Sequence, residues 1–401
     1  MTLAFEPDSL APSEATPTRA PARGPLDFPD SPLSRAARQP LMLGLFLNLQ
    51  DIRFSDLPSS NSWEFDYNVD LVKKADAAGF DIAFSRTQWL PKGGYDGEGS
   101  LDSFVALGAM APVTKSILLI STLHVLYGPW HPLHIAKIGS TFDHIAKGRW
   151  GINIVTGHRA VEHEMFGWNR IEHDKRYDMA GELFDVLGHL WSDDDNFSYE
   201  GGLSQWKVKD GYITPKPKFG RPILVTATGS PAGIDFATSY SDLVFITSPG
   251  GSHIDSALET LPAHIAEIKT RARAKGREVK TIINPMVISR DTEAETEAYL
   301  KAIIDNKPAP SATAFGNPNR GYDSDAVAWL GRKDPSHKQG LNLGGNIEII
   351  GTPEQVVEQL IGLKRAGIDG VQFNFFDFAP DFDHFLATTL PLLREAGLRI
   401  D

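Results

Sequence analysis

The chain has 401 residues, of which 41% are hydrophobic, and it carries a formal net charge of −12 at pH 7. This acidic balance argues against nucleic acid as a partner, because nucleic-acid phosphates require a basic protein surface. The sequence contains no cysteine, which excludes disulfides, thiolate catalysis and cysteine-ligated metals. No apolar run approaches the roughly 20 residues that span a bilayer, and the pattern of a signal peptide is absent. We therefore expect a cytoplasmic protein with no membrane segment.

The N-terminal region differs in composition from the rest of the chain. Residues 1–39 contain seven prolines, with Ser, Ala and Arg between them. Such a composition is poorly suited to a packed core, and it predicts an N-terminal arm. An alternative is that the arm wraps a partner subunit. The remaining residues, 40–401, are expected to form the folded domain.

From residue 40 onward, short apolar segments alternate with segments of helical periodicity. The expected strands occupy residues 41–49, 80–84, 117–122, 150–155, 223–227, 243–247, 281–289 and 371–375. The expected helices lie near 66–78, 101–111, 132–146, 175–192, 254–275 and 291–305, and begin at 230 and 352. Eight alternations predict an α/β fold of the (β/α)8 TIM-barrel type. A doubly wound sheet would use the same alternation, but no G-x-G-x-x-G follows the first strand.

Two segments interrupt this alternation. Residues 196–214 predict a β excursion, with Gly201-Gly202 at its turn. Residues 306–346 lack periodicity and are rich in Gly, Pro and Asn. A segment of that length without a pattern is usually functional or disordered.

Polar residues at the carboxyl ends of the strands are the candidates for chemistry, because barrel active sites lie there. Asn153 is an amide within an apolar strand, so it either bonds a neighbouring backbone group or faces a ligand. The neighbouring strand ends offer Thr122 and His124, and His158 follows the strand of Asn153. His124 is either a loop histidine bonded to backbone or an acid/base group.

A second candidate site lies where the fifth strand meets the next helix, at Gly229-Ser230. Free N–H groups and the helix dipole favour an anion there, and small residues allow a phosphate to approach. The alternative, weighed equally, is that Ser230 only caps the helix. Arg176 and Tyr177 open another helix and could hold the same phosphate.

A catalytic metal is not expected. Several histidines fall in loops at the strand ends, but the strand ends themselves carry mostly Thr, Ser, Asn and aromatic residues. No G-x-S-x-G elbow supports a serine nucleophile. An apolar mouth with hydroxyl and amide groups and one anion site suits an organic cofactor that carries the chemistry itself. Reduced flavin fits, with its phosphate at Ser230, and Thr122 and Asn153 as hydrogen-bond donors to the reacting oxygen.

Four motifs resemble those of the bacterial luciferase-like flavin monooxygenases, closest to the dimethylsulfone, pyrimidine and alkanesulfonate monooxygenase group. In chain order the motifs are Gly128-Pro129-Trp130-His131-Pro132, Gly148-Arg149-Trp150-Gly151-Ile152-Asn153-Ile154-Val155-Thr156-Gly157, Glu172-His173-Asp174-Lys175-Arg176-Tyr177 and Ile350-Gly351-Thr352-Pro353-Glu354-Gln355. The resemblance covers about residues 41 to 397. It implies that residues 306–346 are the family's long insertion before the last barrel unit and that they serve as a lid. It also implies a barrel, dimeric or tetrameric, that uses reduced FMN and O2 with a separate NAD(P)H-dependent reductase.

The resemblance also carries over individual residues. It implies FMN contacts at Thr87, Gln88, Asn153, Glu162, Arg176, Tyr177, Gly229 and Ser230, and an oxygen site near Thr122 or His124. His158 stands where the relatives carry Trp. The loop after the third strand is longer than the corresponding loop of the dimethylsulfone monooxygenases. These departures line the substrate side, so the family's substrates are not carried over.

The prediction is therefore a two-component FMNH2-dependent monooxygenase. It would insert one oxygen into a small organic sulfur compound, of the sulfone or sulfonate type with C–S cleavage, or into an N-heterocycle. Asn153, Thr122, His124 and His158 are the catalytic candidates. The alternatives are a non-catalytic flavin-binding barrel, a deazaflavin-dependent oxidoreductase on the same fold, and a metal-dependent barrel hydrolase.

Overall fold

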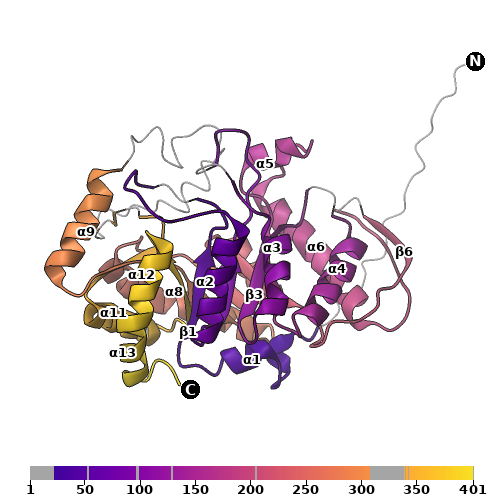
Figure 1. The fold of residues 1–401 in the computed structure, drawn as a ribbon. Coiled ribbons are helices and arrows are strands. Elements are labelled where there is room, and N and C mark those ends of the chain that lie inside the picture. The colour runs from indigo at the N-terminus through magenta and orange to yellow at the C-terminus, as the bar shows by residue number, and fades with distance from the viewer. Residues whose placement is uncertain are drawn as a thin grey trace, which may run out of the picture.

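A closed barrel of parallel strands forms the centre of the computed structural model, which describes residues 22–51, 54–95, 99–127, 130–203, 206–307, 338, 340–341 and 343–400. The eight barrel strands, in the order of their pairing, are β1 (Met42–Leu47), β2 (Ile82–Ser85), β3 (Leu118–His124), β4 (Trp150–Val155), β7 (Ile223–Thr228), β8 (Leu243–Ile246), β9 (Lys280–Ile283) and β12 (Gly370–Phe375). Strand β12 pairs in parallel with β1 and closes the barrel. The expected (β/α)8 fold is confirmed (Figure 1).

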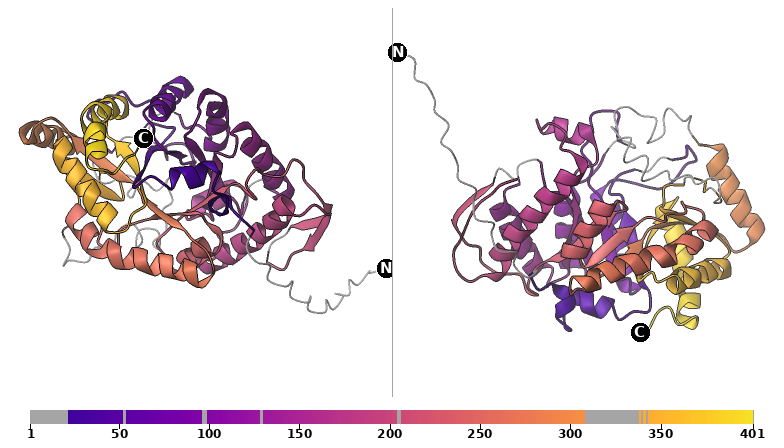
Figure 2. Two further views of the ribbon diagram at one scale, coloured as in Figure 1. Left: turned by 90° about the horizontal axis from the view of Figure 1, so that it is seen from below. Right: turned by 180° about the vertical axis from the view of Figure 1, so that it is seen from behind.

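Helices surround the barrel on its outer face (Figure 2). They are α2 (Phe65–Ala77), α3 (Ser103–Met110) with the 3-10 turn η2 (Ala111–Val113), α4 (Pro132–Ile145), α6 (His173–Ser192), α7 (Pro231–Tyr240), α8 (Ile254–Ala274), α9 (Glu293–Asp305), α11 (Pro353–Arg365), α12 (Phe378–His384), a π turn (Phe385–Thr389) and α13 (Leu390–Glu395). Helix α5 (Ala160–Met165) follows β4 and lies at one end of the barrel (Figure 1). The helix that begins at Pro353 starts as its sequence predicts, with Thr352 and Gln355 forming a reciprocal capping box. No helix in the described part of the chain has the length and apolar composition of a membrane span.

The strand expected over residues 281–289 is divided in the structure. Strands β9 and β10 (Pro285–Ser289) keep one register against β12, with Ile282 opposite Gly370 and Met286 opposite Asn374. Pro285 has no N–H to donate, so the ladder is interrupted where the two strands meet. Strand β11 (Ile347–Gly351), which the periodicity did not predict, pairs in parallel with β10, which itself pairs with β12, and so adds a further strand to the sheet.

The two segments outside the alternation have different outcomes. The β excursion expected over 196–214 is present as an antiparallel pair, β5 (Phe197–Glu200) and β6 (Lys207–Gly211). Most of the expected lid, including residues 308–337, lies outside the described residues.

The part of the N-terminal arm that the structure describes closes one end of the barrel. It contains the 3-10 turn η1 (Pro25–Asp27) and helix α1 (Pro32–Ala36), which cross the barrel floor in the left view of Figure 2. Leu33 is fully buried and packs with the residues that fill the barrel interior. The expectation that the arm stays outside the core is wrong for this residue. Composition missed the short helix, which Ser31 caps and Pro32 begins. Residues 1–21 lie outside the described residues.

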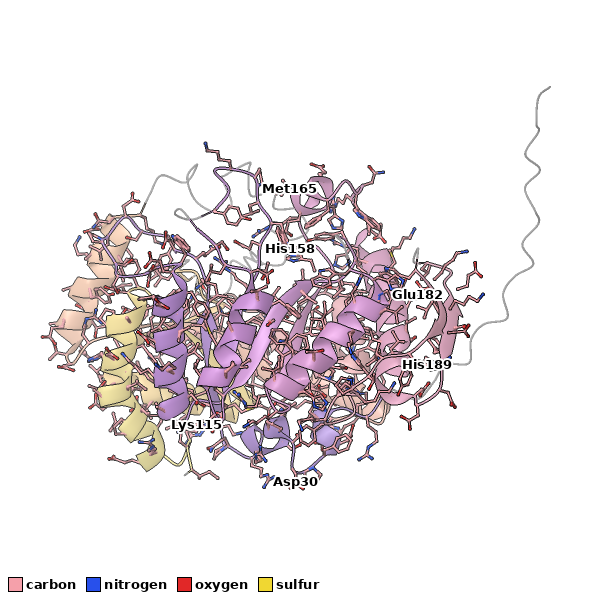
Figure 3. All side chains as sticks on the ribbon, turned by 45° about the vertical axis from the view of Figure 1, so that its right-hand side comes forward. Asp30, Lys115, His158, Met165, Glu182 and His189 are labelled. Carbon is pink, nitrogen blue, oxygen red and sulfur yellow. The ribbon has the colours of Figure 1, made fainter. Side chains whose placement is uncertain are left out.

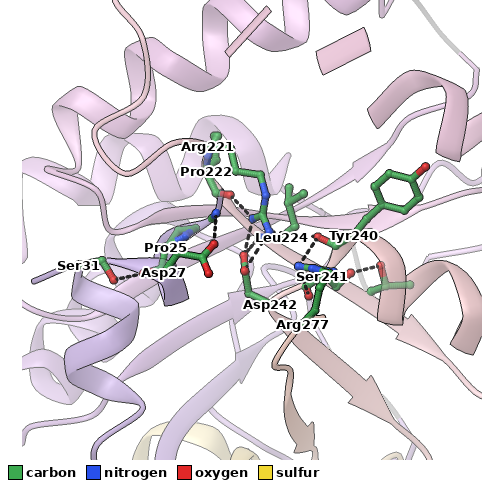
Figure 4. A network of polar contacts seen from close by, with 12 residues as sticks. Pro25, Asp27, Ser31, Arg221, Pro222, Leu224, Tyr240, Ser241, Asp242 and Arg277 are labelled. Atoms are coloured by element: carbon green, nitrogen blue, oxygen red, sulfur yellow. Dashed lines mark hydrogen bonds and ion pairs between the residues drawn. The ribbon is translucent and has the colours of Figure 1, made fainter. Parts of the chain in front are cut away.

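A buried ion pair stands beside the arm at this floor (Figure 4). Arg221 donates two hydrogen bonds to Asp242, at 2.6 and 3.0 Å, and both side chains are at least 95% buried. Asp242 also accepts from the backbone N–H of Leu224 at 2.9 Å. Arg277 donates to the carbonyl oxygens of Tyr240 and Ser241. The floor is therefore a cross-linked polar network between the β7 and β8 segments.

Candidate active site

Strand β4 places Asn153 inside the barrel. Its neighbours Ile152 and Ile154 belong to the apolar layer between the strands and the helices, so the alternation of the strand turns Asn153 inward. The amide Nδ2 donates to the Thr122 hydroxyl at 2.9 Å, and that hydroxyl donates to the Ser85 carbonyl at 2.7 Å. The other amide atom of Asn153, Oδ1, is buried and has no hydrogen-bond partner among the described residues. One end of the Asn153 amide is thus bonded to a side chain rather than to the backbone group that one interpretation expected. The other end has no partner among the described residues, and its contact with a ligand stays a prediction.

Thr122 lies beside Asn153 as expected, but its hydroxyl makes a different hydrogen bond from the one expected. Its only proton goes to Ser85, so in this geometry the hydroxyl has no hydrogen to offer to bound oxygen. The expected donor role is therefore restricted to the second amide hydrogen of Asn153. Thr122 holds Asn153 in place.

Thr87 helps to hold Thr122 in place through hydrogen bonds to Ser103, which lies on the helix outside the barrel strands. Its hydroxyl donates to the Ser103 hydroxyl at 2.8 Å and accepts from the Ser103 backbone N–H at 3.0 Å. The Ser103 hydroxyl in turn accepts from the Thr122 N–H and donates to the Thr122 carbonyl. Thr87 thus supports Thr122, and the proposed flavin contact at Thr87 stays a prediction.

Glu162 joins three of the loops at the barrel mouth. Its side chain is 1% exposed, accepts from the Trp89 backbone N–H at 3.2 Å and bonds the Tyr127 hydroxyl at 3.2 Å. The His124 Nε2 atom lies 3.5 Å from one carboxylate oxygen, and Arg159 lies 3.7 Å from the other. Such a set of contacts fixes the loops after β2, β3 and β4 relative to one another.

Charge rather than burial decides the ionisation of Glu162. Burial alone would raise the pKa of this carboxyl, but His124 and Arg159 outweigh it and hold the pKa below its ordinary value. Burial, followed by the negative charge of Glu162, raises the pKa of the Tyr127 hydroxyl. At neutral pH this cluster therefore holds a carboxylate and a neutral phenol.

Gln88 contacts the same cluster through Arg159. A guanidinium can only donate, so the amide oxygen of Gln88 must face Arg159. In that orientation it accepts at 2.9 and 3.2 Å, and the amide nitrogen donates to Gln50 at 3.3 Å. Arg159 itself is 2% exposed. The position of the Gln88 side chain thus depends on its hydrogen bonds to the buried Arg159.

The turn after β4 brings two histidines to the mouth. Gly157 has a φ of +88°, and a Cβ atom there would lie 2.4 Å from the Tyr127 ring and 2.5 Å from His163 Nε2. His163 is fully buried, whereas His158 is exposed, at the same end of the barrel as α5 (Figure 3). Contact with the surrounding protein, followed by the positive charge of Arg159, lowers the pKa of the His158 imidazole. Its exposure leaves His158 accessible to a small molecule.

The N-terminus of α7 forms the second part of the site. Ser230 caps this helix by accepting from the Gly233 N–H at 3.1 Å, so its capping role is present. Thr228 is 2% exposed, and its hydroxyl has no hydrogen-bond partner among the described residues. A Cβ at Gly233 would lie 1.9 Å from that hydroxyl and 2.8 Å from the Tyr177 hydroxyl. Tyr177 thus reaches the helix end that Gly229 and Ser230 open.

The residues predicted for the site fall on four adjacent strands, β2, β3, β4 and β7, and on the segments that follow them. The structure joins Asn153 to Thr122, Glu162 to His124, and Tyr177 to the α7 end. The buried Arg176 lies near enough to His163 to lower the pKa of that imidazole, after the larger effect of burial. No group of three or more metal-ligating side chains occurs within the described ranges.

Comparison with known proteins decides the family. The model of the luciferase-like monooxygenases matches residues 49–370. The chain belongs to the luciferase-like monooxygenase family. An FMNH2-dependent dimethylsulfone monooxygenase from Pseudomonas fluorescens (strain Pf0-1) is 32% identical over 353 residues, which cover 85% of this chain and 90% of that protein. A pyrimidine monooxygenase from Allorhizobium ampelinum is 29% identical, over 82% of this chain and 89% of that protein.

Solved structures agree on the fold of this family member. A long-chain alkane monooxygenase superposes with a TM-score of 0.74 at 23% identity, over 90% of this chain and 93% of that one. The DmoA protein of Hyphomicrobium sulfonivorans has a TM-score of 0.73 at 20% identity, over 91% and 90%. The expected resemblance is confirmed, and the chain is an enzyme of the flavin-dependent monooxygenase family.

Arg159 was missing from the residues predicted for the site. It is buried against Glu162 and Gln88. Thr228, which ends the strand before Gly229 and Ser230, lies buried beneath the α7 end. Arg159 carried no signal of a buried position, since a charged residue in a loop is ordinarily exposed.

Proposed function

We propose that this chain is the oxygenase of a two-component system that takes reduced FMN from a separate NAD(P)H-dependent reductase. It uses O2 to oxygenate a small organic sulfur compound of the sulfone or sulfonate type, or an N-heterocycle. The relatives named above support the cofactor and both substrate classes. The family resemblance also favours a dimer or tetramer, which sedimentation can test.

The observation that carries the proposal is the cradle at the N-terminus of α7. It combines a helix end, a buried hydroxyl without a partner on Thr228 among the described residues, the hydroxyl of Tyr177, and a close approach of the Gly233 backbone to both hydroxyls that no side chain at residue 233 would allow. Helix N-termini with close backbone approach suit phosphate groups. The residues present therefore fit FMN, with Ser230, Gly229, Tyr177 and Arg176 around its phosphate and Asn153 at its ring.

When bound, reduced flavin supplies the electrons that activate O2, and the protein residues supply position and protons. Glu162 orients the His124 ring through Nε2, and His124 Nδ1 is buried with no hydrogen-bond partner among the described residues. His124 would thus hold or release a proton at Nδ1. The exposed His158 would contact the substrate as it enters.

The test is anaerobic titration with reduced FMN, followed by mixing with O2 and a panel of sulfones, sulfonates and N-heterocycles. We expect binding and a product that depends on the added compound. Binding without any product would favour a non-catalytic flavin-binding barrel. Absence of binding would overturn the cofactor assignment, and a deazaflavin would then be the next cofactor to test.

A matched pair of variants tests the cradle. Tyr177→Phe removes only the hydroxyl near Gly233 and should weaken binding of reduced FMN by about tenfold. Tyr212→Phe removes a hydroxyl from an exposed ring and should leave the affinity unchanged. Equal affinities in the two variants would remove Tyr177 from the phosphate site.

A further inference from the structure

The orientation of the Asn153 amide follows from hydrogen-bond chemistry. A carbonyl oxygen only accepts, so the 2.7 Å contact between Thr122 and the Ser85 carbonyl uses the single proton of the Thr122 hydroxyl. Toward Asn153 the same hydroxyl must therefore accept. The Asn153 atom that lies 2.9 Å away has to be the amide nitrogen.

The atom left over is an acceptor. Asn153 Oδ1 is buried within a residue that is only 4% exposed, and no described residue donates to it. Leaving a buried acceptor unsatisfied is unfavourable, and native structures rarely do so without a reason. A ligand that brings an N–H to this point would remove that penalty.

The relay behind Asn153 is held from a second side. Ser103 donates to the Thr122 carbonyl and accepts from the Thr122 N–H, and Thr87 bonds both the hydroxyl and the N–H of Ser103. Asn153 and Thr122 are both buried, so rotation of the Asn153 amide would break its hydrogen bond to Thr122 at a place where water does not replace it. The acceptor is thus fixed before any ligand arrives.

We propose that Asn153 Oδ1, held by the Thr122–Ser85 relay, makes this site select reduced over oxidised flavin. The inference rests on the flavin assignment proposed above. Reduction adds a hydrogen to N5 of the flavin ring and converts that atom from an acceptor into a donor. A fixed acceptor bonds the N–H of the reduced ring and faces a lone pair in the oxidised ring. Asn153 is then a specificity-determining residue, and Thr122 and Thr87 are positioning residues.

The experiment compares dissociation constants for oxidised FMN in air and for reduced FMN under anaerobic conditions. The unaltered protein should prefer reduced FMN by about tenfold or more. Thr122→Val removes the oxygen that holds the amide nitrogen, frees the amide to rotate, and should bring the preference close to one. Thr122→Ser keeps the hydroxyl and should keep the preference.

A second readout is the midpoint potential of bound FMN. For a two-electron couple, each tenfold loss of preference corresponds to a shift of about 30 mV toward more negative potential. The shift should occur in Thr122→Val and be absent in Thr122→Ser. If Thr122→Val does not fold, Asn153→Ala removes the acceptor itself and should show the same loss.

The outcomes separate this inference from the function on which it rests. Equal preference for reduced FMN in the unaltered protein and in the variant lacking the relay would overturn the role of Asn153 while leaving the flavin assignment intact. Failure of the unaltered protein to bind either form of FMN would overturn the flavin assignment instead.

Discussion

The two ends of the barrel each bury an ion pair, but the pairs are built differently. At the floor, Arg221 and Asp242 meet in two bonds of 2.6 and 3.0 Å, and the carboxylate also accepts a backbone N–H. At the mouth, Arg159 and Glu162 are 3.7 Å apart. The mouth also holds buried polar atoms without hydrogen-bond partners among the described residues. They include His124 Nδ1, Asn153 Oδ1, His163 Nδ1 and Thr228 Oγ1.

This difference separates stability from function along one barrel. At the floor, the partners of Asp242 are supplied by the chain itself, so removing one partner of this pair destabilises the fold whatever is bound. Unsatisfied atoms at the mouth lower stability until a ligand bonds them, and binding then stabilises the folded state. Substitutions at the floor should therefore change stability most, and substitutions at the mouth should change ligand binding most.

The largest effect is expected when the floor pair is broken. Asp242→Ala leaves Arg221 buried without its carboxylate and also removes the acceptor of the Leu224 N–H. Removing one partner of a buried pair costs about 3–5 kcal/mol, measured here as the free energy of unfolding in urea. Asp235→Ala breaks the more exposed pair with Lys275 and should cost under about 1 kcal/mol. Similar losses in the two variants would contradict the assigned role of the floor network.

The stability of the protein should depend on pH through the carboxyl group of Asp143, which lies near the barrel floor. Asp143 is 2% exposed, accepts from the Lys218 N–H, and burial raises its pKa from 3.8 to about 6. The folded state thus binds this proton more tightly, so stability present at pH 4 is lost as the pH rises through 6. At about 1.4 kcal/mol per pKa unit, the loss is about 3 kcal/mol.

The variant Asp143→Asn tests this titration, because its amide oxygen still accepts from Lys218. The variant should be more stable than the unaltered protein at pH 7, with a difference that disappears near pH 4. Thermal unfolding across this pH range measures the difference. A difference that does not depend on pH would show that Asp143 has an ordinary pKa.

Glu162 at the mouth should titrate with the opposite sign. Its pKa is held below the ordinary 4.5, so the carboxylate contributes stability above that pH and the contribution is lost on acidification. Glu162→Gln should cost about 1.5–3 kcal/mol at pH 7, the value of hydrogen bonds to a charged group. The difference from the unaltered protein should shrink below about pH 4.5. A growing difference on acidification would reverse the assigned sign.

The two ends also differ in how far the sequence predicts them. The mouth was predictable in part because parallel strands end together, which brings Asn153 beside Thr122 and places Ser230 at a helix end. The direction of each side chain was not, since Thr87 lies past the end of its strand and points to Ser103. Periodicity near a strand end does not determine which face a loop residue takes.

The floor was hardly predictable at all. Arg221 and Asp242 are 21 residues apart, and neither belongs to a motif that marks a pair. Helix α1 has five residues, too few for a helical period to appear in a proline-rich segment. Strand β11 likewise follows the long segment without a pattern, and its pairing with β10 depends on a tertiary contact. Such features depend on contacts between distant segments, which local patterns do not report.

The smallest change in stability is expected at Ser230. Comparing stability with FMN affinity in variants of this residue distinguishes a helix cap from a phosphate-binding residue. Aspartate is as good an N-cap as serine, so Ser230→Asp should keep the Gly233 bond and alter the free energy of unfolding by under about 0.5 kcal/mol. The added carboxylate would stand where the FMN phosphate is proposed to bind, and it should weaken reduced-FMN affinity by at least about tenfold. Ser230→Thr keeps both the cap and the neutral hydroxyl and should change neither quantity. An unchanged affinity in Ser230→Asp would show that Ser230 only caps α7.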